Sequence, residues 1–241
     1  MAGWQLEALR RPPGRVRRRR QLVPGGASLG KLDAVRKVTA ALWAKQQRHS
    51  GDRHQLFRAV AAAVDAGTVL YPGSWCDVVA SCVWPSVTYV DSDRQAARFF
   101  ADPDGVREIV AAHADAMDPQ VRFIAADYTV PLPLDAGSFD LLVSLYAGPV
   151  SRYCTGYLRV GGVLLANPSH GDVALASTDP RYELTSVIHS HDGGYRYASG
   201  ELESYLVPKT PVEDIAELVE GTGRGIAYTR SAYAYLFRRV C

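Results

Sequence analysis

Cysteine is scarce in this chain, and its spacing excludes the common metal and redox motifs. The four cysteines form no C-x-x-C pair, so no zinc-finger combination of cysteine and histidine pairs is present. The nearest approach to a metal motif, the run HSHD at residues 189–192, lacks a third ligand at a recognisable spacing and is interpreted as a polar loop after a strand. We therefore expect no metal site, and free buried thiols in a reducing compartment.

Long apolar runs are missing as well. No stretch approaches the roughly 18 apolar residues that a membrane-spanning helix needs. The basic N-terminal region is not followed by the apolar segment of a secretory signal. These absences predict a cytoplasmic protein without a membrane span. With 241 residues, 47% of them hydrophobic and 22% charged, the composition suits one globular α/β domain, and it leaves the oligomeric state open.

The net charge of +2 conceals a strong local excess of arginine. Residues 1–30 include the run RRPPGRVRRRR and then VPGGASLG, which offer little for a core to bury and predict a disordered tail. Three interpretations of the tail stay open: a solvated extension, a contact with RNA or the ribosome through counterion release, and a membrane-surface contact. The remainder of the chain is acidic, so the core itself gives no reason to bind nucleic acid.

The pattern of residues 31–241, in which helical and strand segments alternate, predicts a single domain. Two helices are expected within residues 31–66, and strands then alternate with helices five times. That alternation calls for a parallel sheet covered by helices on both faces, which is a doubly wound, Rossmann-like α/β fold. A hairpin or short helical insertion is expected between Tyr195 and Val207, a helix over residues 211–220, and a last strand that ends at Arg238.

The first strand-turn-strand unit has the pattern of a nucleotide-binding sheet. The apolar strand Thr68–Tyr71 is followed by a turn at Gly73, and the next strand stops on Asp91, with Asp93 two residues later. The two acids lie 18 and 20 residues after Gly73, near the spacing of roughly 20 at which an acid meets a ribose hydroxyl. The dinucleotide fingerprint G-x-G-x-x-G is missing, which disfavours a nicotinamide-dependent oxidoreductase.

Two later stretches carry a family resemblance. The stretch AADYTVPLPLDAGSFDLLVSLYAG (residues 125–148) has an acid after the third strand, a Leu-Pro element, and Phe-Asp-Leu-Leu entering the fourth strand. The stretch RVGGVLL (residues 159–165) has a Gly-Gly entry to the fifth strand. In these features the chain from about Leu56 to Val240 resembles the class I S-adenosylmethionine-dependent methyltransferases. The resemblance implies a mostly parallel, seven-stranded sheet with an antiparallel C-terminal strand. The first loop, YPGSWCD, departs from the family's acid-x-Gly-x-Gly and is a degenerate glycine loop.

The resemblance implies S-adenosylmethionine as the cofactor. Asp91 would accept hydrogen bonds from both ribose hydroxyls, and Asp127 would accept one from the adenine amino group, with Tyr128 beside the ring. Each expected contact follows the carboxyl end of a predicted strand, where ligands of open α/β sheets bind. The expected cofactor-binding residues are Tyr71, Pro72, Gly73, Ser74, Asp91, Ser92, Asp127, Tyr128, Ser144 and Leu145.

Candidate catalytic residues follow the fourth and fifth strands. They are Tyr146, Asn167 and His170, of which His170 is a candidate base or else a loop histidine bonded to its own backbone. The run NPSH resembles the Asn-Pro-Pro-aromatic signature of amino-group methyltransferases, although it follows the fifth strand instead of the fourth.

We expect methyl transfer to an unidentified acceptor, a small molecule in preference to a macromolecule. Two alternatives stay open. One is a methyltransferase-like binding or regulatory protein without catalysis. The other is an RNA- or ribosome-directed methyltransferase that uses the arginine-rich tail.

Overall fold

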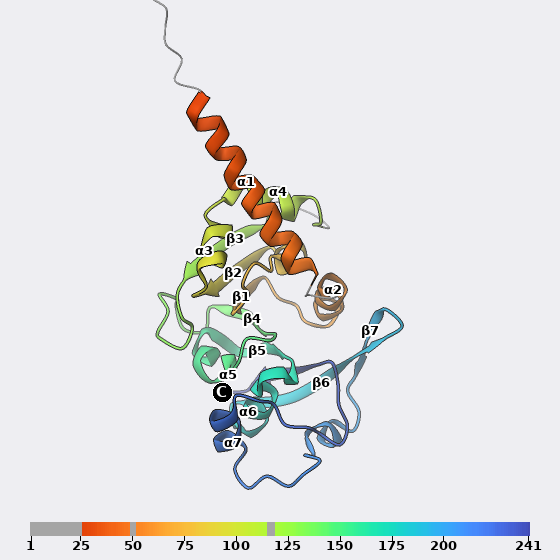
Figure 1. Cartoon of the computed structure of the whole chain (residues 1–241). Helices are drawn as coiled ribbons and strands as arrows, with labels where there is room; N and C mark the ends of the chain where they lie inside the picture. Colours follow the sequence, from red (N-terminus) through yellow and green to blue (C-terminus); the bar gives the residue numbers. More distant parts are fainter. Residues whose placement is uncertain (1–25, 49–51, 115–118) are drawn as a thin grey trace, which may run out of the picture.

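An eight-stranded sheet forms the centre of the fold (Figure 1). In this computed structural model, residues 26–48, 52–114 and 119–241 are described. The strands are β1 (Thr68–Pro72), β2 (Ser86–Asp91), β3 (Gln120–Ala125), β4 (Phe139–Ser144), β5 (Leu158–Ala166), β6 (Tyr182–His191), β7 (Gly194–Ala198) and β8 (Ala234–Arg239).

The strand order is β3-β2-β1-β4-β5-β8-β6-β7. Strands β1 to β5 are parallel, β8 is antiparallel to both of its neighbours, and β7 pairs antiparallel with β6. The predicted Rossmann-like fold, with its mostly parallel sheet and antiparallel last strand, is confirmed. Strand β7 is an addition to the seven strands that the sequence predicts.

The helices include one that the sequence did not predict, α6, and one that begins later than expected, α7. They are α1 (Gly26–Gln47), α2 (Arg53–Ala63), α3 (Arg94–Phe100), α4 (Pro103–Ala111), α5 (Val150–Cys154), α6 (Asp172–Thr178) and α7 (Ile215–Thr222), with 3-10 turns η1 (Val79–Cys82), η2 (Thr155–Tyr157), η3 (Pro168–His170) and η4 (Leu202–Leu206). Helix α1 begins at Gly26, inside the segment predicted as a tail, whereas residues 1–25 lie outside the described part. Helix α7 begins at Ile215 and not at Pro211, because Asp214 caps it by accepting the N–H of Glu217 at 2.9 Å.

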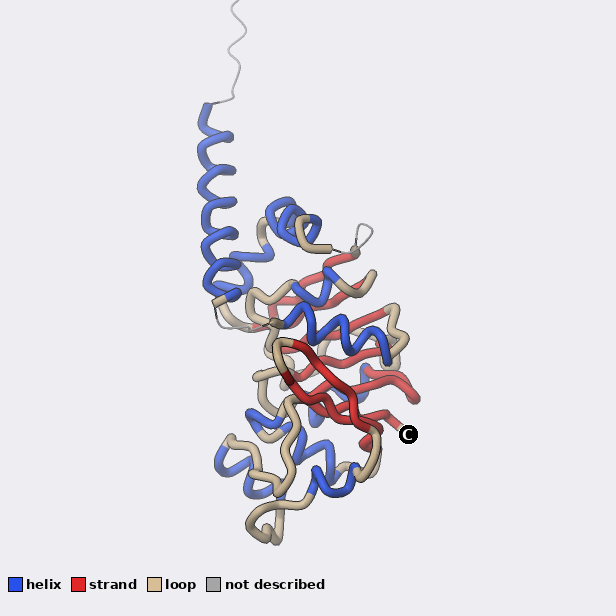
Figure 2. Tube along the Cα trace, turned by 90° about the vertical axis from the view of Figure 1, so that its right-hand side faces the viewer, coloured by secondary structure: helices blue, strands red, loops and turns tan. Residues whose placement is uncertain are grey.

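Alternate side chains of the central strands pack on opposite faces of the sheet. In β1, Val69 and Tyr71 join the core that includes α2, α3 and α4, whereas Leu70 joins the core that includes α5, α6 and α7. In β4, Leu141 and Leu142 divide between the two cores in the same way. Figure 2 shows the sheet between its helices. Burial on both faces explains why these strands are continuous apolar runs.

Two peripheral elements are tied to the domain by hydrogen bonds. Helix α1 lies along α3 and α4 (Figure 1), and the Thr39 hydroxyl donates to the Asp102 carboxylate at 2.8 Å. Strand β7 contacts α2, where the Tyr197 hydroxyl donates to the carbonyl of Ala59 at 2.5 Å. No helix in the described ranges is long and apolar enough to cross a membrane.

Candidate functional site

The strand order reverses between β1 and β4, so the loops after these strands meet at a topological switch point, where ligands of such sheets bind. Gly73 follows β1 with φ +65°, and its N–H donates to the carbonyl of Val90 at 2.8 Å. A Cβ at Gly73 would stand 2.5 Å from the Cβ of Ala147, in the loop after β4. Only glycine allows the two loops to approach this closely.

Asp91 ties the first loop to the end of β2. Its Oδ2 accepts the N–H of Trp75, and its Oδ1 accepts the N–H of Asp93, both at 2.7 Å. Each carboxylate oxygen keeps a second lone pair, and the residue is half-buried at the switch point. Asp93, in contrast, is the N-cap of α3 and accepts the N–H of Gln95 at 2.6 Å. Ser92 between them is exposed.

Asp127 and Tyr128 follow β3 and face different partners. The exposed Asp127 carboxylate accepts the N–H and the hydroxyl of Thr129 at 2.9 and 2.8 Å, and these bonds lower its pKa. The Tyr128 hydroxyl donates to the carbonyl of Ala147 at 2.5 Å, and burial raises its pKa. Tyr128 therefore links the loop after β3 to the loop after β4.

Some expected cofactor residues turn their side chains into the core. The Tyr71 side chain is buried beneath the first loop, and Leu145 is buried as well. The Ser144 hydroxyl hydrogen-bonds the carboxylate of Asp172, which also accepts the N–H of Ser151 at 3.0 Å and the hydroxyl of the same serine. These residues can contribute backbone atoms to a ligand, while their side chains stabilise the loops.

Asp172 makes the stability of the domain dependent on pH. It is fully buried, and burial raises its pKa from 3.8 to about 6 against the opposing effect of the bonds from Ser144 and Ser151. The folded chain therefore holds this proton more tightly than the unfolded chain. The associated stabilisation is complete below about pH 4, is lost as the pH rises to about 6, and amounts to about 3 kcal/mol.

We expect the unfolding free energy of the wild type to fall relative to Asp172→Asn as the pH rises from about 4 to about 7. Urea denaturation of both proteins across this range measures the difference. Tyr128, Cys154 and Tyr182 are the titratable groups coupled to Asp172, and the raised pKa of each keeps it neutral in this range. A difference between the two proteins that does not change with pH would contradict the assignment.

The loop after β4 contains a residue with an unusual backbone conformation. Tyr146 has φ +61°, and buried Asn167 accepts its N–H through Oδ1 at 3.1 Å. The Tyr146 hydroxyl hydrogen-bonds the side chain of Tyr233, which also hydrogen-bonds Tyr195. The guanidinium of Arg53 lies 5.5 Å from the Tyr146 ring. Strained residues of this kind persist where their surroundings fix them, and they concentrate at functional sites.

The structure thus brings Tyr146 and Asn167 together and adds residues that the sequence did not single out. Burial raises the pKa of Tyr146 and of Tyr233, so both hydroxyls stay protonated and donate hydrogen bonds instead of acting as bases. Tyr233 had a detectable signal: it precedes an antiparallel strand, and the start of such a strand lies beside the ends of its parallel neighbours. No sequence pattern pointed to Arg53.

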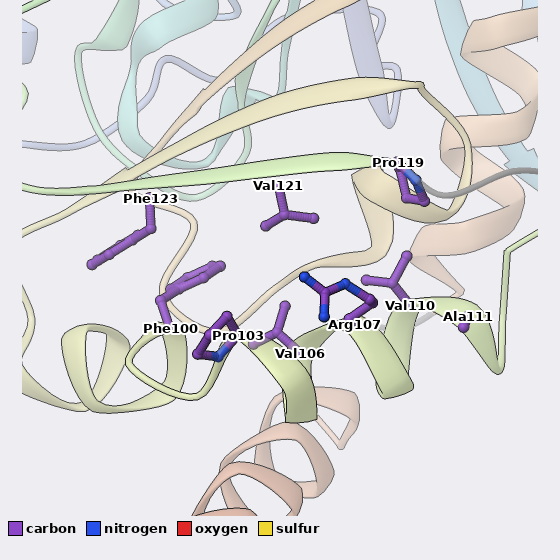
Figure 3. Close-up of a pocket in the computed structure, with 9 residues that line it drawn as sticks. All are labelled: Phe100, Pro103, Val106, Arg107, Val110, Ala111, Pro119, Val121 and Phe123. Atoms are coloured by element: carbon purple, nitrogen blue, oxygen red, sulfur yellow. The ribbon is translucent and has the colours of Figure 1, made fainter. Parts of the chain in front are cut away.

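His170 lies exposed at the end of η3 and lines a cavity of about 500 Å³ together with Tyr146. We call it the α5–α7 cavity, because it lies between residues 146–149 after β4, turn η3, and helices α5, α6 and α7. A separate cavity of about 330 Å³ lies between α4 and β3. Figure 3 shows its mostly apolar wall, including Phe100, Phe123 and Arg107. None of the expected site residues lines that second cavity.

The residues at the switch point fit the adenosyl group that the resemblance implies. Asp91 offers side-chain oxygens with unused lone pairs beside the first loop. The Ser74 hydroxyl, in the same loop, is buried and has no hydrogen-bond partner within the described part of the chain. A buried polar group without a partner is rare, and it suits a site completed by a polar ligand.

No protein-family model matches the chain, and no curated protein matches it in sequence. Solved structures with a similar fold include the 16S rRNA methylase RmtB (14% identity, 87% of this chain and 74% of that chain, TM-score 0.47). Two others are the tRNA methyltransferase TrmI from Aquifex aeolicus (13%, 78% and 69%, 0.45) and cofactor-bound Rv0187 from MTB (15%, 73% and 89%, 0.42). These likenesses concern the fold alone.

Proposed function

We propose that this chain, whose strand order and direction are those of the class I methyltransferase fold, binds S-adenosylmethionine at the β1/β4 switch point and transfers its methyl group to a small-molecule acceptor. The observation that carries the proposal is the place of Asp91. Its half-buried carboxylate ends β2, is held against the first loop by the N–H of Trp75, and keeps lone pairs for two ribose hydroxyls.

The cofactor supplies a methyl group that its sulfonium already activates. The protein's part is therefore to orient the acceptor and to exclude water. The loop after β4 suits that part, because Asn167 and the bond from Tyr128 to Ala147 fix its backbone. The neutral hydroxyls of Tyr146 and Tyr233 can orient a polar group of the acceptor by hydrogen bonding.

Calorimetric titration with S-adenosylmethionine, S-adenosylhomocysteine and NAD tests the proposal. We expect the two sulfur ligands to bind and NAD not to bind. Asp91→Asn is expected to weaken binding of the sulfur ligands by about tenfold to a hundredfold, because hydrogen bonds to a charged acceptor contribute about 1.5–3 kcal/mol. Absence of binding to the wild type would refute the proposal.

Asp93→Asn is the matched control, since it removes a carboxylate two residues further on that caps α3. It should leave cofactor affinity unchanged and change the stability little, because asparagine is about as good an N-cap as aspartate. Thermal unfolding of both variants shows whether Asp91→Asn acts on the ligand or on the fold. If the two variants weaken binding of the sulfur ligands equally, Asp91 has no specific role in binding them.

One observation favours a second function, a binding or regulatory protein that keeps the fold without the chemistry. The first loop packs so tightly on Ala147 that the space beside Gly73 is filled by protein. The two loops then have to separate before a cofactor can bind between them, whereas a protein that binds no cofactor needs no such movement. Failure of all three ligands to bind would favour this second function.

A further inference from the structure

Two aromatic side chains are exposed within the ranges that the structure describes, and both line the α5–α7 cavity. The exposed fraction is 49% for Tyr146 and 44% for Tyr153, which lie on different elements. Single apolar side chains scattered over a surface are normal, whereas exposed rings that line the same cavity indicate a binding site. The volume of about 500 Å³ lies within the range of sites for small organic ligands.

The remaining walls define what the cavity can hold. Apolar Leu175 and Val219 contribute from α6 and α7, and the imidazole of His170 contributes from η3. Arg152 and Glu220 form an ion pair with each other across α5 and α7, so their charges cancel. The walls are aromatic and apolar, and the ion pair adds no net charge to them. Such walls suit a flat, uncharged ring with a polar substituent.

The cavity also reaches the switch point. Ala147 lines it, and the same residue is the one against which Gly73 packs. The loops after β1 and β2 do not line the cavity, so its occupant and a ligand held by Asp91 would approach each other at the edge of the loop after β4. An acceptor in the cavity is therefore placed beside the expected cofactor site without competing for it.

We propose that the α5–α7 cavity is the acceptor site and that the acceptor is a small, uncharged aromatic alcohol. This inference rests on the proposed function. In the transfer, the carbon–oxygen bond forms at the acceptor hydroxyl as the carbon–sulfur bond breaks, and the electron pair of that bond stays on sulfur. The hydroxyl proton leaves to the His170 imidazole or to water. The products are an aryl methyl ether, S-adenosylhomocysteine and one proton.

Calorimetric titration with 2-naphthol tests the chemistry of the site. Two matched probes separate its features: 2-naphthoate keeps the rings and adds a negative charge, and decahydro-2-naphthol keeps the hydroxyl and removes the aromatic rings. We expect 2-naphthol to bind most tightly of the three. Tyr153→Ala should weaken its binding by about tenfold, because a well-placed aromatic contact contributes about 0.5–1.5 kcal/mol beyond its area.

Blocking variants test the location. Glu220→Trp places an indole at the wall of the cavity and should abolish 2-naphthol binding. Leu218→Trp is the control, since Leu218 is exposed on the same helix and does not line the cavity. Glu220→Gln removes the ion pair without filling the space and should change the affinity by less than about tenfold, because exposed ion pairs contribute about 0–1 kcal/mol.

Two results together would establish the site. Glu220→Trp abolishes 2-naphthol binding whereas Leu218→Trp keeps it, and the wild type forms 2-naphthyl methyl ether in the presence of S-adenosylmethionine. Three outcomes would overturn this inference and leave the cofactor proposal standing. The first is cofactor binding without 2-naphthol binding, and the second is an equal loss of 2-naphthol affinity in both tryptophan variants. The third is binding of both ligands without formation of the ether. Binding of 2-naphthol without any cofactor binding would overturn both proposals.

Discussion

Asp77→Ala is expected to lower the free energy of unfolding by about 3–5 kcal/mol. Asp77 is completely buried, and Arg53, with which it forms an ion pair at 3.1 Å, is 6% exposed. The same carboxylate accepts the Tyr71 hydroxyl at 3.2 Å and the N–H of Val79 at 3.0 Å. Removing the carboxylate takes the balancing negative charge from a buried guanidinium, and desolvation makes that costly.

Asp104→Ala is the matched control for this prediction. Asp104 also forms an ion pair with an arginine, Arg107, but the two side chains are 69% and 62% exposed. Exposed pairs contribute about 0–1 kcal/mol, so the control should unfold close to the wild type. Urea denaturation followed by circular dichroism measures both variants. A loss below about 1 kcal/mol for Asp77→Ala would show that the domain accommodates Arg53 without its carboxylate.

The Asp77 network also connects stability to the site. Arg53 donates to the Tyr71 hydroxyl at 2.6 Å and lies over the Tyr146 ring. Burial raises the pKa of Tyr71, so its hydroxyl stays protonated and can donate to Asp77 while it accepts from Arg53. The start of α2, the first strand and the loop after β4 are thus held together by one buried polar cluster, which orients Tyr146.

The sequence predicted the sheet well, because the information for parallel strands is local. Runs such as Thr68–Tyr71 and the acid that ends the next strand can be recognised without knowledge of the rest of the fold. Strand β7 was harder, since it is short, pairs with β6 in a hairpin and is followed closely by the turn η4, so its pattern is weak. The start of α7 was misplaced because Pro211 and Asp214 are both acceptable first-turn signals.

Within the site, the sequence located backbone positions better than side-chain roles. Ser144 stands at the end of β4 as predicted, yet its hydroxyl serves Asp172, which lies 28 positions later. Tyr71 likewise ends β1, but its partners Arg53 and Asp77 come from two other elements. Such contacts depend on how α2 and the loops pack on the sheet, and periodicity along one segment contains no information about that packing.

Gly73→Ala is expected to cost about 2–5 kcal/mol of stability, from two separate penalties. The left-handed φ of +65° disfavours any residue with a Cβ, at about 1–2 kcal/mol. The new Cβ would also stand 2.5 Å from the Cβ of Ala147, and overpacking of this kind costs about 1–3 kcal/mol. Urea denaturation of the variant gives the total.

Two further variants separate the penalties and show what the first loop requires. Gly137→Ala has a similar φ of +63° with its nearest neighbour at an ordinary 3.8 Å, so it should show the conformational cost alone. Adding Ala147→Gly to Gly73→Ala removes the 2.5 Å contact and leaves the Cα of residue 147 at 3.3 Å, so the stability should recover most of the way to the level of Gly137→Ala. If the double variant is no more stable than Gly73→Ala, the contact between the loops is not what selects glycine. Recovery, in contrast, would show that close packing of the loops after β1 and β4 is sufficient to require glycine in the degenerate loop.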